Sequence, residues 1–430
     1  MNRRQFYLYA GAVILLALLV REYFVLVAQV RSPYGGDASE YIAYAEHLLA
    51  GWFGKGAVPD AYRTPGYPLF VMLSMWPGDW YTHLMHMQAI VGTLTVAGTI
   101  SLTRQFAPRG WALAAGVLIA LWPHHIAATG EVLSEVLLGG LIVLALLLST
   151  RRYAVAAGIA FGLGYLINPI LALFPFVVAF VYWRDGFGKQ GLTMLLVSLV
   201  AVAGWGIRNT SLGVSGNDRA YINLVQGSYP LYQAAYVSRN ADPEPARIIA
   251  AITAEQTAME ADHAQGLQTM LQRMQREPSV YVRWYLSKPF LLWDWDVRIG
   301  EGGPYVHQVY KSPLEGHPLL RATTSLLKAA NPLLFALSLA FAAWTVWRRQ
   351  SSQIVALAFL YLTAIHVVLQ ADPRYATAYR PMEVLLAMCA LSAVYARIES
   401  ARHRSAECRR AKVGDNGRGV IVEADGREYG

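Results

Sequence analysis

An aspartate follows the first apolar stretch of the chain. Gly35 and Gly36 precede Asp37, and an amphipathic segment with Tyr41 at its start continues through 42–50. A carboxylate on a glycine-rich turn can take the proton of a hydroxyl group that lies within hydrogen-bond distance. Asp37 could also cap the following helix together with Glu40, and a cap leaves one carboxylate oxygen free. We therefore predict that Asp37 is a catalytic general base.

An arginine and a tyrosine occupy a proline-rich turn at 62–70. Pro65 and Pro68 restrict the backbone there and are expected to hold Arg63 at the outer surface, with Tyr67 beside it. The planar guanidinium offers two donors to a phosphate, although an arginine at this depth could instead contact lipid headgroups. We predict that Arg63 and Tyr67 bind substrate.

Two carboxylates, Glu131 and Glu135, lie four residues apart at the start of an apolar stretch. This spacing places both on one face of a helix, directed towards a common cavity. A carboxylate inside a membrane is costly and normally has a function, although pairing with an arginine to hold helices together would also explain it. Both are predicted to bind substrate.

Further basic and aromatic candidates lie at the ends of later apolar stretches. A guanidinium group at such a position can bind an anion through two donors at once. Arg374 could instead form an ion pair with the neighbouring Asp372. The predicted substrate-binding set is completed by Arg208, Arg374, Tyr375 and Arg380.

The histidines do not form a metal-binding pattern. His83, His86, His124 and His125 lack the spacing of zinc ligands, and adjacent histidines at a membrane interface are typical polar anchors. We predict no metal site built by the protein and no certain cofactor, while a divalent cation stays open.

The composition requires a membrane environment for these residues. The chain has 430 residues, of which 55% are hydrophobic and 15% charged, with two cysteines and a net charge of +8. Soluble domains carry roughly 25% charged residues. The basic residues lie between apolar runs, which excludes nucleic acid as a partner. Ten apolar stretches are long enough to be transmembrane helices: 6–30, 84–103, 111–130, 131–150, 153–168, 169–183, 191–207, 324–347, 353–371 and 381–397.

The distribution of positive charge orients the predicted bundle. With a cytoplasmic amino terminus, every cytoplasmic connection carries Lys or Arg. The outer side then receives a first loop at 31–83, a large loop at 208–321 and a short connection at 372–381. The segment 280–295 mixes charge with aromatic residues and is predicted to lie in the outer interface, with Trp284, Tyr285, Trp293 and Trp295 at headgroup level. Residues 1–397 form the catalytic domain, and 398–430 a disordered cytoplasmic tail.

Several motifs together resemble the polytopic GT-C glycosyltransferases. Gly36-Asp37 followed by Tyr41, and Arg63-Thr64-Pro65-Gly66-Tyr67-Pro68-Leu69-Phe70, look most like the family 39 protein mannosyltransferases and the lipid A aminoarabinose transferases. Weaker matches are Leu133-Ser134-Glu135, the stretch 204–209, and Asp372-Pro373-Arg374-Tyr375 with Arg380-Pro381. The chain departs from the family at Ala38, where a second acidic residue is usual, and at Asn168, where a basic residue often precedes the proline.

The resemblance implies an all-α polytopic fold, with about ten transmembrane helices, amphipathic interfacial helices and an outer helical region. It implies transfer of a sugar from a polyprenyl phosphate to an acceptor hydroxyl on the outer face, with inversion, Asp37 at the catalytic position and arginines on the lipid phosphate. The partners would be that donor, a lipid, glycan or protein acceptor, and membrane lipids. The expected location is a bacterial plasma membrane, with the site facing the periplasm or exterior.

Two alternatives remain at this point. A transporter or flippase of lipid-linked glycans would also be polytopic, but such proteins usually carry ionisable residues deep in their spans and a twofold sequence repeat. A glycan polymerase or ligase would join lipid-linked sugars at the same membrane face.

Overall fold

The computed structural model describes residues 1–30, 35–75, 78–214 and 218–416, and this part of the chain is almost entirely helical. The one sheet among these residues is a two-stranded antiparallel ribbon of β1 (Gln29–Val30) and β2 (Val309–Lys311). Helices dominate because a backbone in lipid must satisfy its hydrogen bonds within each segment. The all-α membrane fold predicted from the sequence is confirmed.

All ten predicted apolar stretches lie on helices. The helices that carry them are α1 (Arg3–Val27), α4 (Trp80–Thr103), α5 (Arg109–Ala120), α7 (Glu135–Thr150), α8 (Ala154–Ile167), α9 (Phe174–Arg184), α10 (Gly188–Ser211), α17 (Pro318–Trp347), α18 (Gln353–Val368) and α20 (Arg380–Asn416).

The number of full-length spans is smaller than ten. Within the described residues, five helices are long and apolar enough to cross a membrane alone: α1, α4, α10, α17 and the segment Pro373–Arg404. A sixth results if α5 and the helical turns after it count as one span. Four apolar helices have 10–17 residues, and at 1.5 Å per residue they are shorter than the roughly 30 Å hydrocarbon core.

The third predicted span is broken. The axis bends by 53° between α5 and Pro123–Gly130, which contains α6 (Pro123–Ala127) and η1 (Ala128–Gly130). Pro123 starts the second part because proline cannot donate a helical hydrogen bond. The bend buries Trp122, His124 and His125 inside the protein.

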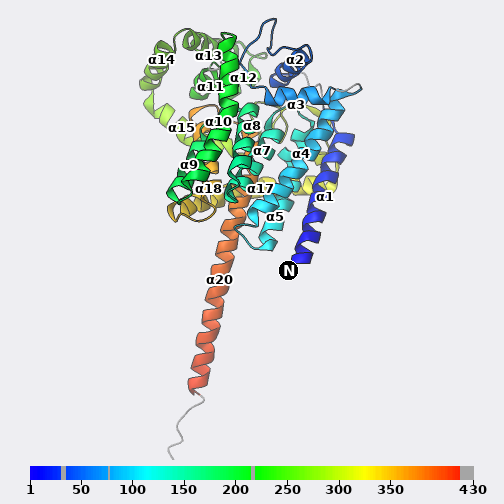
Figure 1. Cartoon of the computed structure of the whole chain (residues 1–430), viewed down its shortest axis with the longest axis vertical. Helices are drawn as coiled ribbons and strands as arrows, with labels where there is room; N and C mark the ends of the chain where they lie inside the picture. The colour runs from blue at the N-terminus through cyan, green and yellow to red at the C-terminus, as the bar shows by residue number, and fades with distance from the viewer. Residues whose placement is uncertain (31–34, 76–77, 215–217, 417–430) are drawn as a thin grey trace, which may run out of the picture.

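The connections that were predicted to be outer gather at one end of the bundle. Figure 1 shows α2 (Asp37–Leu49) and α3 (Gly66–Ser74) at this end, as well as α11 (Asp218–Ser228), α12 (Tyr232–Ser238), α13 (Pro243–Ala261) and α14 (His263–Arg276). The start of α1 and the projecting part of α20 lie at the opposite end. This arrangement agrees with the predicted separation of the 31–83 and 208–321 regions from the amino terminus.

The segment predicted to lie in the outer interface is partly inside the protein. It forms α15 (Pro278–Leu292), but Trp293 and Trp295 are buried, and Trp293 packs against Phe335 and Phe359. Lys288 is also buried and donates to the carbonyl oxygens of Gly227 and Leu369. The prediction that Trp293 and Trp295 lie at headgroup level is therefore wrong: Trp293 packs against α17 and α18, and Trp295 packs against Trp122 and His124.

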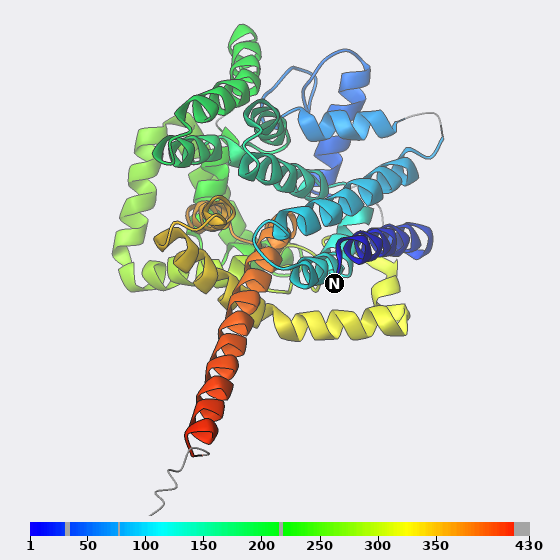
Figure 2. The same cartoon turned by 60° about the horizontal axis from the view of Figure 1, so that its bottom comes forward.

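The carboxyl-terminal helix is longer than expected. α20 continues to Asn416 and projects from the bundle in Figures 1 and 2. Residues 398–416 are thus helical rather than irregular, because this stretch is rich in alanine, arginine and glutamate, which favour helices. The rest of the predicted tail, 417–430, lies outside the described residues.

Candidate functional site

A polar cavity of about 520 Å³ lies among the segments that were predicted to be outer. Residues from α2, the loop after it, α11, α12, the loop before β2 and the start of α19 (Pro373–Ala376) line it. Asp37, Arg63, Arg374 and Tyr375, all predicted from the sequence, are among these residues. The volume is in the range of sites for small organic ligands.

Asp37 occupies the first turn of α2 rather than its cap. Gly36 is the N-cap residue, with φ of +53°, a conformation that glycine adopts without strain. No side chain caps this helix end, so the predicted capping pair of Asp37 and Glu40 is wrong. The carboxylate of Asp37 is free to interact with the cavity, at the end of the helix where negative charge is favoured.

One oxygen of Asp37 pairs with Arg63. The Nη2 atom of Arg63 lies 2.5 Å from Oδ1 of Asp37 and 2.5 Å from Oε2 of Glu40. Lys55 also pairs with Glu40, at 2.7 Å. The side chain of Arg63 is only 2% exposed, so the two carboxylates compensate a guanidinium that has lost most of its water.

The other oxygen of Asp37 pairs with Arg374. Nη2 of Arg374 donates to Oδ2 of Asp37, and Nε donates to Oε1 of Glu135 at 2.8 Å. Arg374 therefore connects α2 to α7 across the cavity wall. The resulting network alternates in charge through Lys55, Glu40, Arg63, Asp37, Arg374 and Glu135.

The network keeps Asp37 ionised. Burial alone would raise the pKa of Asp37, but the charges of Arg63 and Arg374 outweigh it and hold this pKa well below its usual range. Arg219 on α11 acts in the same direction. The carboxylate is thus a stable anion that can accept a proton only when part of this positive charge is withdrawn.

Tyr67 lies beneath the network rather than in the cavity. Its side chain is fully buried, its hydroxyl donates to Gln88 at 3.2 Å, and its ring packs edge-on against Tyr41 at 4.7 Å. The ring of Tyr41 in turn lies 4.7 Å from the guanidinium carbon of Arg63. Tyr67 therefore supports Arg63 from below, and the structure does not place it in contact with a ligand.

Glu131 and Glu135 do not share a helical face. Glu131 precedes α7, and its Oε1 accepts the backbone N–H of Val306 at 2.8 Å. Burial raises the pKa of Glu131 to about 7. Neither carboxylate lines the cavity: Glu131 anchors the loop before β2, and Glu135 holds Arg374. The prediction that both face substrate is replaced by two positioning roles, because the helix starts four residues later than the spacing suggested.

Arg208 and Arg380 are held away from the cavity. Arg208 donates to the carbonyl oxygens of Asp60 and Phe53, at 2.5 and 2.8 Å, and so ties α10 to the loop after α2. Arg380 is fully buried, with Glu383 at 2.7 Å and Asn331 at 2.8 Å. Both arginines hold elements together, which corrects their prediction as phosphate ligands.

Several tyrosines line the cavity. Tyr375 lines the cavity, stacks on His366 with 5.0 Å between ring centres, and donates its hydroxyl to Gln370 at 3.0 Å. Tyr232 and Tyr236 from α12 also line it. Fixed aromatic rings of this kind can pack against a sugar ring.

Several residues that line the cavity were not predicted from the sequence, and two of them, Arg219 and His307, carry titratable side chains of interest. Arg219 lies in the first turn of α11, and His307 precedes β2. Burial and Arg374 lower the pKa of His307, and its Nε2 has no hydrogen-bond partner among the described residues. Only their location in the large outer loop indicated them, because neither belongs to a motif.

The predicted polar anchors His124 and His125 are buried at the bend after α5. Nε2 of His124 lies 2.7 Å from the carbonyl oxygen of Trp295. Among the described residues, no group of three or more His, Cys, Asp or Glu side chains could hold a metal ion.

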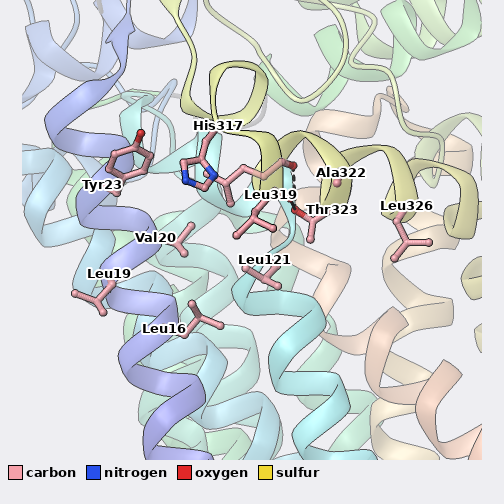
Figure 3. A pocket seen from close by; sticks show the side chains of 11 residues that line it. Leu16, Leu19, Val20, Tyr23, Leu121, His317, Leu319, Ala322, Thr323 and Leu326 are labelled. Carbon is pink, nitrogen blue, oxygen red and sulfur yellow. Dashed lines mark hydrogen bonds between the residues drawn. The ribbon is translucent and has the colours of Figure 1, made fainter.

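A second hollow is apolar. It has a volume of about 720 Å³ and lies between α1 and the start of α17, with Leu16, Val20, Leu121 and Leu326 in its wall (Figure 3). His317 and Tyr23 are at one end. This wall has the chemistry of a hydrocarbon contact and offers no group for catalysis.

The fold and cavity define an all-α multi-pass membrane protein with a charged site at its outer-loop end. No family model matches the chain, and no curated protein matches it. Among solved structures, the archaeal oligosaccharyltransferase AglB from Archaeoglobus fulgidus, in complex with an inhibitory peptide and a dolichol-phosphate, is similar over 97% of this chain and 53% of its own, with 16% identity and a TM-score of 0.45.

ArnT from Cupriavidus metallidurans, bound to undecaprenyl phosphate, is similar over 92% of this chain and 78% of its own, with 14% identity and a TM-score of 0.39. This chain spans about half the length of the oligosaccharyltransferase.

Proposed function

We propose that this protein is a membrane glycosyltransferase that moves a sugar from a polyprenyl-phosphate carrier to an acceptor hydroxyl. The observation that carries the proposal is the position of Asp37, which lies in a polar cavity between the guanidinium groups of Arg63 and Arg374. A carboxylate next to fixed positive charge provides both a proton acceptor and stabilisation for a departing anion.

The reaction follows from these charges. The acceptor hydroxyl transfers its proton to Asp37 while its oxygen forms a bond to the anomeric carbon. The bond from this carbon to the phosphate oxygen breaks, and the electron pair leaves with the lipid phosphate. Because the oxygen attacks on the face opposite the phosphate, the configuration at carbon inverts.

Binding of the donor would change the pKa of Asp37. With two guanidinium groups beside it, the carboxylate is a weak base in the structure. A donor phosphate bound in the cavity adds negative charge that offsets part of the positive charge around Asp37. The pKa of Asp37 then rises when donor is bound, which limits proton transfer to the occupied site.

We place the cavity on the outer face of a bacterial plasma membrane, facing the periplasm or the exterior. The basic connections between apolar helices support a cytoplasmic amino terminus, and the helices α2, α11 and α12, which line the cavity, lie at the opposite end of the bundle (Figure 1). The donor would be a polyprenyl-phosphate sugar from the membrane, and the acceptor a lipid, glycan or protein hydroxyl.

The test uses the purified full chain in lipid nanodiscs with radiolabelled polyprenyl-phosphate monosaccharides and a panel of lipid, glycan and peptide acceptors. The proposal predicts label on an acceptor, with release of polyprenyl phosphate. A parallel assay in liposomes measures movement of the labelled lipid between leaflets. Lipid movement without any acceptor product would support the flippase alternative and exclude transfer. Growth of a glycan by repeating units would favour the polymerase or ligase alternative.

A further inference from the structure

Arg219 lines the cavity close to Asp37, and none of the carboxylates whose side chains the structure describes forms an ion pair with it. We propose that Arg219 is the residue that binds the phosphate group of the lipid-linked donor. This inference rests on the proposed transfer reaction and assigns a specific ligand to a residue that belongs to no sequence motif. It is carried by the placement of Arg219 in the cavity and by the partners of the other cavity arginines.

The other cavity arginines are already engaged. Arg63 pairs with Asp37 and Glu40, and Arg374 pairs with Asp37 and Glu135. Arg239 donates to the carbonyl oxygen of Tyr236 and lies over its ring, 3.9 Å from the centre. A phosphate that used Arg63 or Arg374 alone would have to displace a buried carboxylate, and an unpaired buried charge is costly.

Arg219 has no such obstacle. Among residues whose side chains the structure describes, no carboxylate lies within ion-pair distance of Arg219. Its guanidinium carbon lies 6.0 Å from the centre of the Tyr62 ring. It lies close enough to Asp37 for its charge to lower the pKa of that carboxylate. Arg219 can therefore bind an anion beside the reacting carboxylate without breaking the ion-pair network.

The negative charge that develops in the reaction favours such a group. The donor is a phosphodiester with one negative charge, and breaking the bond to the sugar leaves a phosphate monoester with a second one. An arginine free of carboxylates stabilises this charge as it develops, and its planar fork can contact two phosphate oxygens. The acceptor proton goes to Asp37, so Arg219 needs to transfer none.

The binding experiment uses undecaprenyl phosphate in nanodiscs and, separately, inorganic phosphate. Arg219→Ala should weaken binding of undecaprenyl phosphate at least tenfold, and Arg219→Lys should retain part of the affinity because it keeps the charge but not the fork. Arg247→Ala is the matched control, since Arg247 is an exposed arginine on α13 outside the cavity and should bind like the native protein. Thermal stability and size-exclusion profiles show whether each variant is folded.

The outcomes separate this inference from the proposed function. If folded Arg219→Ala binds undecaprenyl phosphate as tightly as the native chain does, the assignment of Arg219 is wrong while the transfer reaction stands. If the native chain binds inorganic phosphate through Arg219 but not undecaprenyl phosphate, the anion site stands and the lipid-linked donor is excluded. If neither probe binds the native chain, both are overturned.

Discussion

Arg374 donates a hydrogen bond to Asp37 although 337 residues of chain separate them. The contact brings the start of α2 together with the short connection before α20. It explains how two weak motifs, one near each end of the membrane region, contribute to a single site. Glu135 completes the arrangement because it holds the Nε atom of Arg374 and so fixes the direction of the guanidinium.

Removing Arg374 should destabilise the protein. Arg374→Ala leaves the buried Glu135 without its ion-pair partner and Asp37 with Arg63 alone, and breaking a buried pair costs about 3–5 kcal/mol. The double variant Arg374→Met with Glu135→Leu should recover part of this loss, because one buried carboxylate is removed as well. Thermal unfolding of the purified variants measures both effects.

Arg298→Ala is the control for this prediction. Its ion pair with Asp294 is exposed, with 51% and 40% of the two side chains accessible, and such pairs contribute about 0–1 kcal/mol. Equal losses for Arg374→Ala and Arg298→Ala would contradict a structural role for the network.

Glu131 should make stability depend on pH. Its folded pKa, about 7, exceeds the ordinary value of 4.5, so the folded state binds the proton more tightly. This contribution to stability is fully present below about pH 4.5 and is lost as pH rises through 7. One pKa unit corresponds to about 1.4 kcal/mol, which bounds the effect at roughly 3 kcal/mol.

Glu131→Gln should flatten this part of the profile, because a glutamine oxygen can still accept the N–H of Val306 but carries no charge. The measurement is the thermal midpoint between pH 5 and 8. Glu260→Gln, at an exposed position on α13, should keep the native slope. A native-like slope in Glu131→Gln would show that another group causes it.

Arg208 should matter for stability and not for substrate affinity. Arg208→Ala removes two hydrogen bonds to carbonyl oxygens and the contact with Trp205, and we expect a loss of roughly 1–3 kcal/mol. The KM for a lipid-linked donor should stay within about twofold of the native value in the folded fraction. A large increase in KM with unchanged stability would restore the sequence-based interpretation of Arg208 as a phosphate ligand.

The sequence predicted the helices better than the contacts of the site. Long apolar runs must be helical in a membrane, so α1, α4, α10 and α17 could be predicted from composition alone. The short helices were harder to predict. The apolar run that contains Pro123 was predicted to be one span, although the helix axis bends by 53° at that point.

The predicted residues fall into two groups, because some of them line the cavity and others lie outside it. Asp37, Arg63 and Arg374 could be found because glycine and proline mark the turns that carry them. Arg208 and Arg380 could not be excluded, since a sequence does not reveal which arginine turns towards a carbonyl group or a buried glutamate. Arg219 could not be singled out, because it belongs to no motif and only the fold places it in the cavity beside Asp37.

The central claim is that Asp37 accepts the acceptor proton in transfer from a lipid phosphate. The most direct test compares single-turnover transfer by native protein and Asp37→Asn, with donor affinity measured on the same samples and Asp296→Asn, at the exposed ion pair with Lys328, as control. We predict that Asp37→Asn lowers the rate by about 10²–10⁴ while donor affinity changes only a few fold, and that Asp296→Asn behaves like the native chain. Transfer at the native rate by folded Asp37→Asn would contradict the account.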